Sequence, residues 1–124
     1  MANLIYDNFK VQNKYQLNSE DYRSLTLLYL PLMGIDSYTT FAVLMSLDYD
    51  EVYPFKKVLD LLHFTNINLF NKALDKLEGL GLVQTYFSES KGYLFQMNPP
   101  LSFKEYFDNE LLSGLLEAQI GEVE

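Results

Sequence analysis

The sequence contains no cysteine and no tryptophan, and it has a single histidine. Without cysteine, disulfide bonds, thiol catalysis and thiolate metal sites are excluded. No uninterrupted apolar run reaches the roughly 18 residues of a membrane-spanning helix. Residues 1–16 also lack the basic and then apolar layout of a secretory signal. These absences predict a cytoplasmic chain that has no thiol-based centre.

Positive charge is scarce, because 9 Lys and Arg residues oppose 17 Asp and Glu residues, which gives a net charge of −8. Arg23 is the only arginine, and the acidic excess is spread over both halves of the chain. Nucleic-acid-binding domains usually carry a basic stripe, since much of their affinity comes from neutralised phosphates. The balance disfavours tight binding to duplex DNA, and it disfavours attachment to an anionic membrane by charge alone.

Aromatic residues, in contrast, are abundant, with 10 Tyr and 9 Phe among 124 residues. A disordered chain is poor in such residues, so most of this chain is expected to fold. Its length suits one domain that buries roughly two thirds of its unfolded surface. The surplus of Tyr and Phe also indicates an exposed apolar patch, since these residues are enriched at the centres of protein interfaces.

Periodicity predicts a strand, four helices, a hairpin and a helical end. Residues 9–17 alternate between apolar and polar, with Asn13 as the exception, which is typical of a half-buried strand. Helical spacing and capping residues then predict helices over residues 19–30, 36–47, 54–62 and 66–80. Pro31 is expected to end the first of these helices, and Gly81 to follow the fourth in a left-handed conformation.

A hairpin is predicted from residues 82–87 and 93–97, joined by the polar turn 88–92. Ser102 is predicted to cap a short helix, and a last helix is predicted to begin at Asp108. A strand, helices, a helix–helix pair and a hairpin follow the order of a winged helix. The fold class is therefore α+β, a winged helix with an N-terminal strand and a C-terminal helical extension. The expected segments are an arm at 1–18, the winged helix at 19–98 and the extension at 99–124.

Four segments resemble a known family. They are LYLPLMGIDSYTTFAVLMSL at 28–47, FNKALDKLEGLGLVQTY at 70–86, YLF at 93–95 and PLSFKEYFDNELL at 100–112. Together they are similar, in order and spacing, to the N-terminal winged-helix domain of the primosomal DnaB/DnaD family of low-GC Gram-positive bacteria. This DnaB is the replication initiation and membrane attachment protein, and the resemblance covers about residues 19–121.

The resemblance implies a non-enzymatic oligomerisation domain of a scaffold that acts in replication initiation and in loading the replicative helicase. It implies a homo-oligomer, a dimer or tetramer, whose partners are other primosomal proteins and the helicase. DNA would be bound mainly through downstream domains absent from this chain. No cofactor, metal or small-molecule substrate is implied, and the expected location is the cytoplasm, with association with the nucleoid as an option.

The lone strand suggests where self-association takes place. It has no neighbouring hairpin partner, so it must pair with a distant segment or with another chain, and an unpaired edge can add to the sheet of a second subunit. The alternative is that it pairs with the hairpin of its own chain. The predicted self-association residues are Phe9, Val11, Tyr15, Leu17, Tyr22 and Tyr29.

The alternative function is a sequence-specific DNA-binding transcriptional regulator. The fourth helix lies where winged helices carry their recognition helix. Asparagine can read adenine and lysine can meet phosphate, so the candidate DNA contacts are Asn68, Asn71, Lys72, Lys76 and, on the hairpin turn, Lys91. Asp75 and Glu78 on the same helix would repel the phosphate backbone. Single-stranded DNA could stack on exposed Tyr or Phe, but such platforms normally lie in basic grooves, which the sequence does not indicate.

Catalytic and metal-binding patterns are weak. His63 stands between Leu62 and Phe64 without the convergent ligands of a metal site, so we interpret it as a packing residue or one bonded to a carbonyl oxygen. Asp48, Asp50 and Glu51 lack the ordered ligand set and central glycine of a calcium loop and are interpreted as a solvated acidic loop. Gly79 and Gly81 follow a helix instead of opening one, the reverse of a phosphate-binding loop. The sequence therefore predicts no enzyme and no metal.

Overall fold

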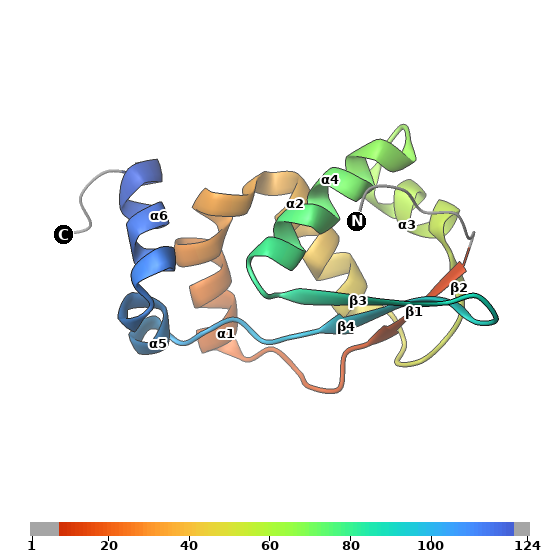
Figure 1. The fold of residues 1–124 in the computed structure, drawn as a ribbon, viewed down its shortest axis with the longest axis horizontal. Helices are drawn as coiled ribbons and strands as arrows, with labels where there is room; N and C mark the ends of the chain where they lie inside the picture. Colours follow the sequence, from red (N-terminus) through yellow and green to blue (C-terminus); the bar gives the residue numbers. More distant parts are fainter. Residues whose placement is uncertain (1–7, 121–124) are drawn as a thin grey trace.

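The computed structural model describes residues 8–120, so residues 1–7 of the expected N-terminal arm and residues 121–124 lie outside the description (Figure 1). The elements, in chain order, are β1 (Asn8–Gln12), α1 (Ser19–Ser24), the π-helical turn η1 (Leu25–Tyr29), α2 (Leu30–Ser46), β2 (Tyr53–Pro54), α3 (Phe55–Leu62), α4 (Ile67–Gly79), β3 (Val83–Ser88), β4 (Gly92–Met97), α5 (Phe103–Asp108) and α6 (Glu110–Ile120). The α+β winged-helix fold is confirmed.

The sheet has four strands in the order β2-β1-β4-β3. β3 and β4 form the predicted antiparallel hairpin, with Val83 opposite Met97. β1 lies parallel to β4, with Phe9 opposite Tyr93, and its other edge pairs with β2, where Phe9 lies opposite Tyr53. The strand therefore ends at Gln12 instead of residue 17 and finds both partners within its own chain. The expectation of a free β1 edge is wrong, and the alternative of pairing with its own hairpin is confirmed.

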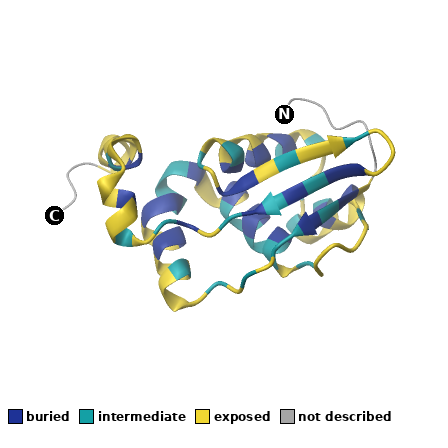
Figure 2. Ribbon diagram, turned by 60° about the horizontal axis from the view of Figure 1, so that its bottom comes forward, coloured by how far each residue is buried: buried dark blue, intermediate teal, exposed yellow. Residues whose placement is uncertain are grey.

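Helices cover one face of this sheet, and buried and accessible residues alternate along β1 and β4 (Figures 1 and 2). Phe9, Val11 and Phe95 point into the core and are at most 1% exposed. The ring of Phe9 lies 4.8 Å from that of Phe55 and 5.4 Å from that of Phe95, measured between centroids. Much of the aromatic surplus therefore fills the core between the sheet and α2, α3 and α4.

The helical segment from Ser19 to Ser46 differs from the prediction in its break point. Pro31 comes just after the π-helical turn η1, and the backbone stays helical through it, so it does not end the helix. The helix bends instead at Gly34, whose φ of 80° and ψ of 173° suit a residue without Cβ. By length and composition alone this 28-residue segment could cross a membrane, but the core helix of a globular domain meets the same criterion.

Local capping signals are confirmed at three helices. Asn18 and Asp21 form a reciprocal capping box at α1, and Ser102 and Glu105 form a second one at α5. The Asn66 side chain accepts hydrogen bonds from the backbone N–H groups of Asn68 and Leu69 at α4. Gly81 has the predicted left-handed conformation, with a φ of 78°. These helix starts are determined by residues within one turn.

Two tyrosines attach the C-terminal helices to η1. The hydroxyl of Tyr106 donates to the Leu28 carbonyl oxygen at 2.7 Å, and the Leu101 N–H donates to the Tyr29 hydroxyl at 3.1 Å. The two rings meet edge to face at 5.2 Å. Burial raises the pKa of Tyr106 to about 12 and also raises the pKa of Tyr29. Residues from all three expected segments thus contribute to one core.

Asn13, the exception in the predicted alternation, joins the sheet layer to α2. Its side-chain amide nitrogen donates to the carbonyl oxygens of Leu47 at 2.7 Å and Met45 at 3.0 Å, and it lies 3.3 Å from that of Leu44. The last carbonyl groups of a helix have no partner within the helix, so this side chain satisfies part of the C-terminal end of α2. These hydrogen bonds explain why a polar residue occupies this position in the sequence.

Candidate functional site

Three of the predicted self-association residues lie in the core. Phe9, Val11 and Tyr29 are at most 1% exposed, because β1 is an inner strand and η1 faces α5. Their side chains cannot touch a second copy while the domain is folded as described. For these three residues the expected role at an exposed interface is corrected to a role in packing.

The other three residues come together at one place on the surface. Tyr15, Leu17 and Tyr22 line a shallow pocket of about 260 Å³ together with Met45 of α2. Tyr22 is half exposed and Leu17 partly buried. The Tyr15 hydroxyl is buried and has no hydrogen-bond partner among residues 8–120, and burial, with the Asp21 carboxylate as a lesser cause, raises the pKa of Tyr15 above its usual range. Their assignment to self-association stays a prediction.

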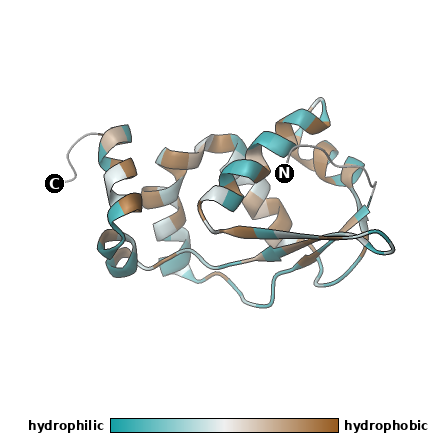
Figure 3. Ribbon diagram, viewed as in Figure 1, coloured by the Kyte–Doolittle hydropathy of each residue, from teal (hydrophilic) through white to brown (hydrophobic). Residues whose placement is uncertain are grey.

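Exposed apolar side chains are frequent at one end of the molecule. We call α1, η1, α5 and α6 the helical end. Figure 1 shows α5 and α6 far from the 88–92 turn. Figure 3 shows that hydrophobic residues recur along α6. Leu112 and Leu116 face the core, whereas Leu111 and Leu115, one turn apart on the neighbouring face, are 72% and 44% exposed. The exposed large apolar side chains of the helical end are Tyr22, Leu27, Phe107, Leu111, Leu115 and Ile120.

The helix α4 does not present the predicted DNA contacts as one surface. Asn68 and Lys72 are exposed, but Asn71 is buried, because it lies on the inward face of α4 between Phe70 and Leu74. Lys76 is exposed and reaches the Met33 carbonyl oxygen at 3.5 Å, beside the Gly34 bend. Asn71 is therefore corrected to a core position.

The environment of α4 also has mixed charge. A pocket of about 360 Å³ between α2 and α4 is lined by Asp36 and Asp75 as well as by Lys72 and Lys76. Lys91, the fifth candidate, lies on the 88–92 turn and lines a different pocket, on the wing sheet. Carboxylates beside the lysines of α4 repel a phosphate backbone. The structure therefore gives no added support to sequence-specific binding of duplex DNA by this helix.

The face of the sheet turned away from the helices is a second surface, which the sequence analysis missed. The register places Lys10 beside Leu94 and Leu94 beside Tyr86, in one row across three strands. A parallel row consists of Gln12, Gln96 and Gln84. We call these six residues the open sheet face. The alternation of apolar and polar residues in the sequence can indicate which side chains of a strand point outward. It cannot show that they form rows, because the rows depend on the register between β1, β4 and β3.

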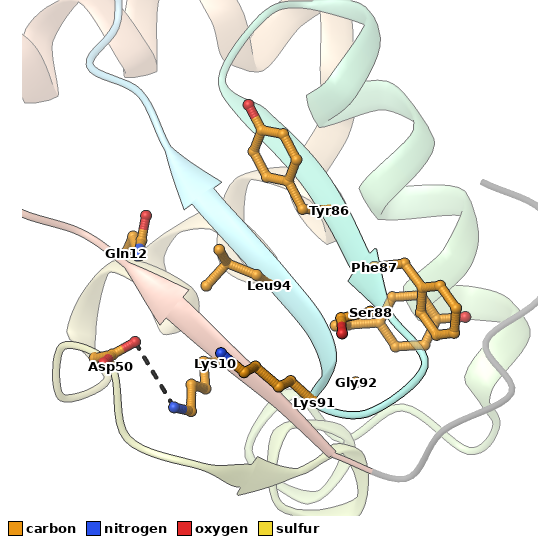
Figure 4. A pocket seen from close by; sticks show the side chains of 10 residues that line it. Lys10, Gln12, Asp50, Tyr86, Phe87, Ser88, Lys91, Gly92 and Leu94 are labelled. Atoms are coloured by element: carbon orange, nitrogen blue, oxygen red, sulfur yellow. Dashed lines mark ion pairs between the residues drawn. The ribbon is translucent and has the colours of Figure 1, made fainter.

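This open sheet face is hollowed. A pocket of about 300 Å³ is lined by Lys10, Asp50, Tyr86, Lys91 and Leu94, among others (Figure 4). The Lys10 ammonium lies 4.0 Å from the Asp50 carboxylate, at the outer limit of an ion pair. In Figure 4 the two lysines lie toward one end of the pocket and Tyr86 toward the other, with Leu94 between them.

No group of three or more His, Asp or Glu side chains able to hold a metal occurs within residues 8–120. His63 ends α3 in a left-handed conformation, with a φ of 57°, and is exposed instead of packed as expected. Asp50 is also left-handed, and its N–H donates to the Val11 carbonyl oxygen at 2.9 Å, so the acidic loop is fastened to β1.

Comparison with known proteins identifies a family and a similar solved structure. The model of the DnaB N-terminal winged helix domain family matches residues 5–124. The fold is similar to the crystal structure of the primosome protein DnaB (residues 1–300) from Geobacillus stearothermophilus, with a TM-score of 0.81 and 31% sequence identity. The match covers 93% of this chain and 46% of that chain, so this chain spans less than half of the relative's length.

Proposed function

Because this chain belongs to the DnaB N-terminal winged helix domain family, a domain of primosomal proteins, we propose that it is the non-enzymatic self-association domain of a replication scaffold. The scaffold would act in the cytoplasm, in replication initiation and in loading of the replicative helicase. Its partners would be further copies of itself and other primosomal proteins. The resemblance of four sequence segments and the family match support this proposal.

The observation that carries self-association is the apolar surface of the helical end. Of the twelve large apolar side chains that are exposed among residues 8–120, the helical end holds the six already named. Single exposed apolar residues are common on protein surfaces, but a concentration of them marks an interaction site. On α6, two apolar stripes lie side by side, and only the one with Leu112 and Leu116 is covered by the domain itself.

The mechanism we propose is multivalency. When two or four copies associate, the DNA-binding parts attached to them are held together, and the second binding event becomes intramolecular. The effective concentration for linked modules reaches the millimolar range, which raises avidity without any new contact. The winged helix then needs no tight DNA binding of its own, in keeping with a net charge of −8.

Light scattering coupled to size exclusion, over a series of protein concentrations, tests the proposal. The unchanged chain is expected to have the mass of a dimer or tetramer. The double substitution Leu111→Glu and Leu115→Glu is expected to give a folded monomer, because it places two charges on the uncovered stripe of α6. Circular dichroism of the same samples checks that the helices remain folded.

A matched control replaces two apolar residues with comparable exposure outside the helical end. Val52→Glu and Leu61→Glu change side chains that are 56% and 53% exposed. This control is expected to keep the mass of the unchanged chain. A monomeric unchanged chain at every concentration would remove the proposed function. An oligomer that survives the α6 substitutions would overturn only the assignment of the surface and direct attention to Tyr15, Leu17 and Tyr22.

A further inference from the structure

We propose that the open sheet face binds single-stranded nucleic acid. This inference is independent of self-association, because the open sheet face and the helical end share no residue. It is based on three features that meet on one surface: clustered lysines, an exposed ring beside an apolar side chain, and a row of side-chain amides. The fold brings them together from β1, β3, β4 and the 88–92 turn.

The first feature is local charge. Lys10 and Lys91 line the first pocket, and Lys14 lines an adjoining pocket of about 430 Å³ that shares Gln12 with it. Three of the nine basic residues of the chain thus border one groove, and Asp50 is the only acidic residue among those lining the two pockets. Lys10 is held near Asp50, so the lysines that line the two pockets exceed the carboxylates by two, and this local excess is complementary to a phosphate backbone.

The second feature is a stacking position. Tyr86 is 46% exposed, and Leu94, its neighbour in the register, lies between it and the two lysines (Figure 4). Bases stack on aromatic side chains without requiring a particular sequence, and such contacts are strongest where a basic groove follows the backbone. A strand lying across the sheet can therefore place a base on Tyr86 while its phosphates meet Lys10 and Lys91.

The third feature favours nucleic acid over an acidic peptide as the ligand of this surface. Gln12, Gln96 and Gln84 lie side by side on three neighbouring strands, about 4.8 Å apart. Each side-chain amide both donates and accepts, as base edges do, whereas a carboxylate only accepts. The carboxylates of an acidic peptide would use the lysines but neither the acceptor atoms of the amides nor the ring of Tyr86. We therefore assign the surface to bases and phosphates together.

The experiment measures fluorescence anisotropy of a labelled oligo(dT) of about 15 nucleotides, a length within the range that single-strand-binding modules cover. Binding is expected at low salt and is expected to weaken as salt rises. Tyr86→Ala is expected to weaken it about ten-fold, in line with the loss of one stacked base, and Tyr86→Phe to preserve it. Oligo(rU) in a parallel titration shows whether the sugar matters; binding of either strand supports the proposal.

Lysine substitutions test the charge contribution. Lys10→Ala with Lys91→Ala is expected to reduce the slope of log affinity against log salt by about 1.4, the value for two lost phosphate contacts on a single strand. The matched control, Lys56→Ala with Lys57→Ala, removes equal charge from α3, outside both pockets. This control is expected to leave the slope nearly unchanged.

Several results would overturn the proposal. One is the absence of binding to either strand at low salt, and another is an unchanged affinity after Tyr86→Ala. An equal effect of the α3 control and of the Lys10 and Lys91 pair would show attraction by total charge instead of by this face. Competition by polyglutamate as effective as that by unlabelled oligo(dT) would assign the groove to acidic peptides. Duplex DNA that binds more tightly than the single strand would exclude base stacking on the sheet.

Discussion

At the scale of single residues, two polar side chains hold distant segments together. Asn13 joins the end of α2 to the segment that follows β1, and Tyr106 joins α5 to η1. Asn13 donates to carbonyl oxygens at the C-terminal end of α2, where helical partners run out, and Tyr106 donates to the Leu28 carbonyl oxygen within η1. Leaving a buried or half-buried acceptor without its donor lowers the free energy of unfolding by more than an average hydrogen bond contributes to it.

Replacement of Asn13 should therefore lower the free energy of unfolding. For Asn13→Ala we expect a loss of about 1–3 kcal/mol, because the carbonyl oxygens at the end of α2 lose their donor. Asn13→Asp should cost more, since it places a carboxylate at the negative end of the helix. Urea denaturation followed by circular dichroism measures both. The neighbouring exposed change Gln16→Ala serves as a control, and a loss as large as that of Asn13→Ala would contradict the assignment.

Tyr106 makes stability depend on alkaline pH. Its pKa is raised to about 12, whereas an unfolded tyrosine has a pKa near 10. Between these values the unfolded chain loses the proton and the folded domain keeps it, so stability should fall as pH rises above about 10. Below that range both states hold the proton and this contribution is constant.

Tyr106→Phe should cost about 0.5–1.5 kcal/mol at neutral pH, the usual net contribution of one hydrogen bond. It should also make the decline of stability above pH ~10 shallower, since one of the three tyrosines with a raised pKa (Tyr15, Tyr29 and Tyr106) is gone. Denaturant midpoints at a series of pH values measure both effects. Tyr22→Phe, at a half-exposed position, should change neither, and an alkaline decline identical in the Tyr106 variant and the unchanged chain would argue against the buried hydroxyl as its source.

At the scale of elements, the bend in α2 is where the helical layer changes direction. Gly34 has a φ of 80° and a ψ of 173°, a region that essentially only glycine occupies. A Cβ built at this position would meet no atom within 4 Å, so any cost of substitution comes from the backbone alone. Gly114 also has open space around its Cβ position, but it lies in α6 without a positive φ.

The two glycines should therefore respond to alanine in opposite directions. We expect Gly34→Ala to destabilise the domain by about 1–3 kcal/mol, the cost of holding a non-glycine residue in this region. Gly114→Ala should stabilise it by about 0.5–1 kcal/mol, because alanine favours a helix interior. Thermal and urea unfolding measure the pair. Equal shifts for both would show that the bend does not require glycine.

The elements also show how far the sequence alone could predict this structure. Helix starts near residues 19 and 66 and the cap at Ser102 can be predicted because capping depends on residues one turn away. The bend at Gly34 was misplaced to Pro31, since a proline through which a helix continues and a proline that ends a helix look alike in sequence. The two-residue strand β2 has no periodicity to detect, and β1 finds its neighbours only through contacts that are distant in sequence.

The same limit applies to the candidate sites. Asn71 and Lys72 are both polar, and only the packing of α4 shows that the first is buried and the second exposed. Phe9 and Val11 were assigned to an exposed interface because their strand had no partner nearby in the sequence, and the sheet order places them in the core. Tyr86 and Lys10 come from strands far apart in the sequence, so the groove that they line is visible only in three dimensions.

At the scale of the whole molecule, the sheet and the helical end separate two kinds of surface. The core is shared, and it runs from Phe9 in β1 to Leu116 in α6. The helical end carries an uncovered apolar stripe, whereas the open sheet face and the pockets on it carry lysines, amides and the exposed ring of Tyr86. Copies joined through their helical ends would leave their sheets accessible, so the proposed self-association and the proposed strand binding are compatible in one assembly.

The parallel pairing of β1 with β4 has a consequence for the order in which the chain is made. A ribosome releases Phe9 long before Tyr93, its partner in the register. At synthesis rates of about 5–20 residues per second, the interval is on the order of ten seconds. During that interval the first strand has no sheet to join, and two residues destined for the core stay in contact with water or with chaperones. The first strand can therefore pair with β4 only after the chain has been translated as far as about residue 97.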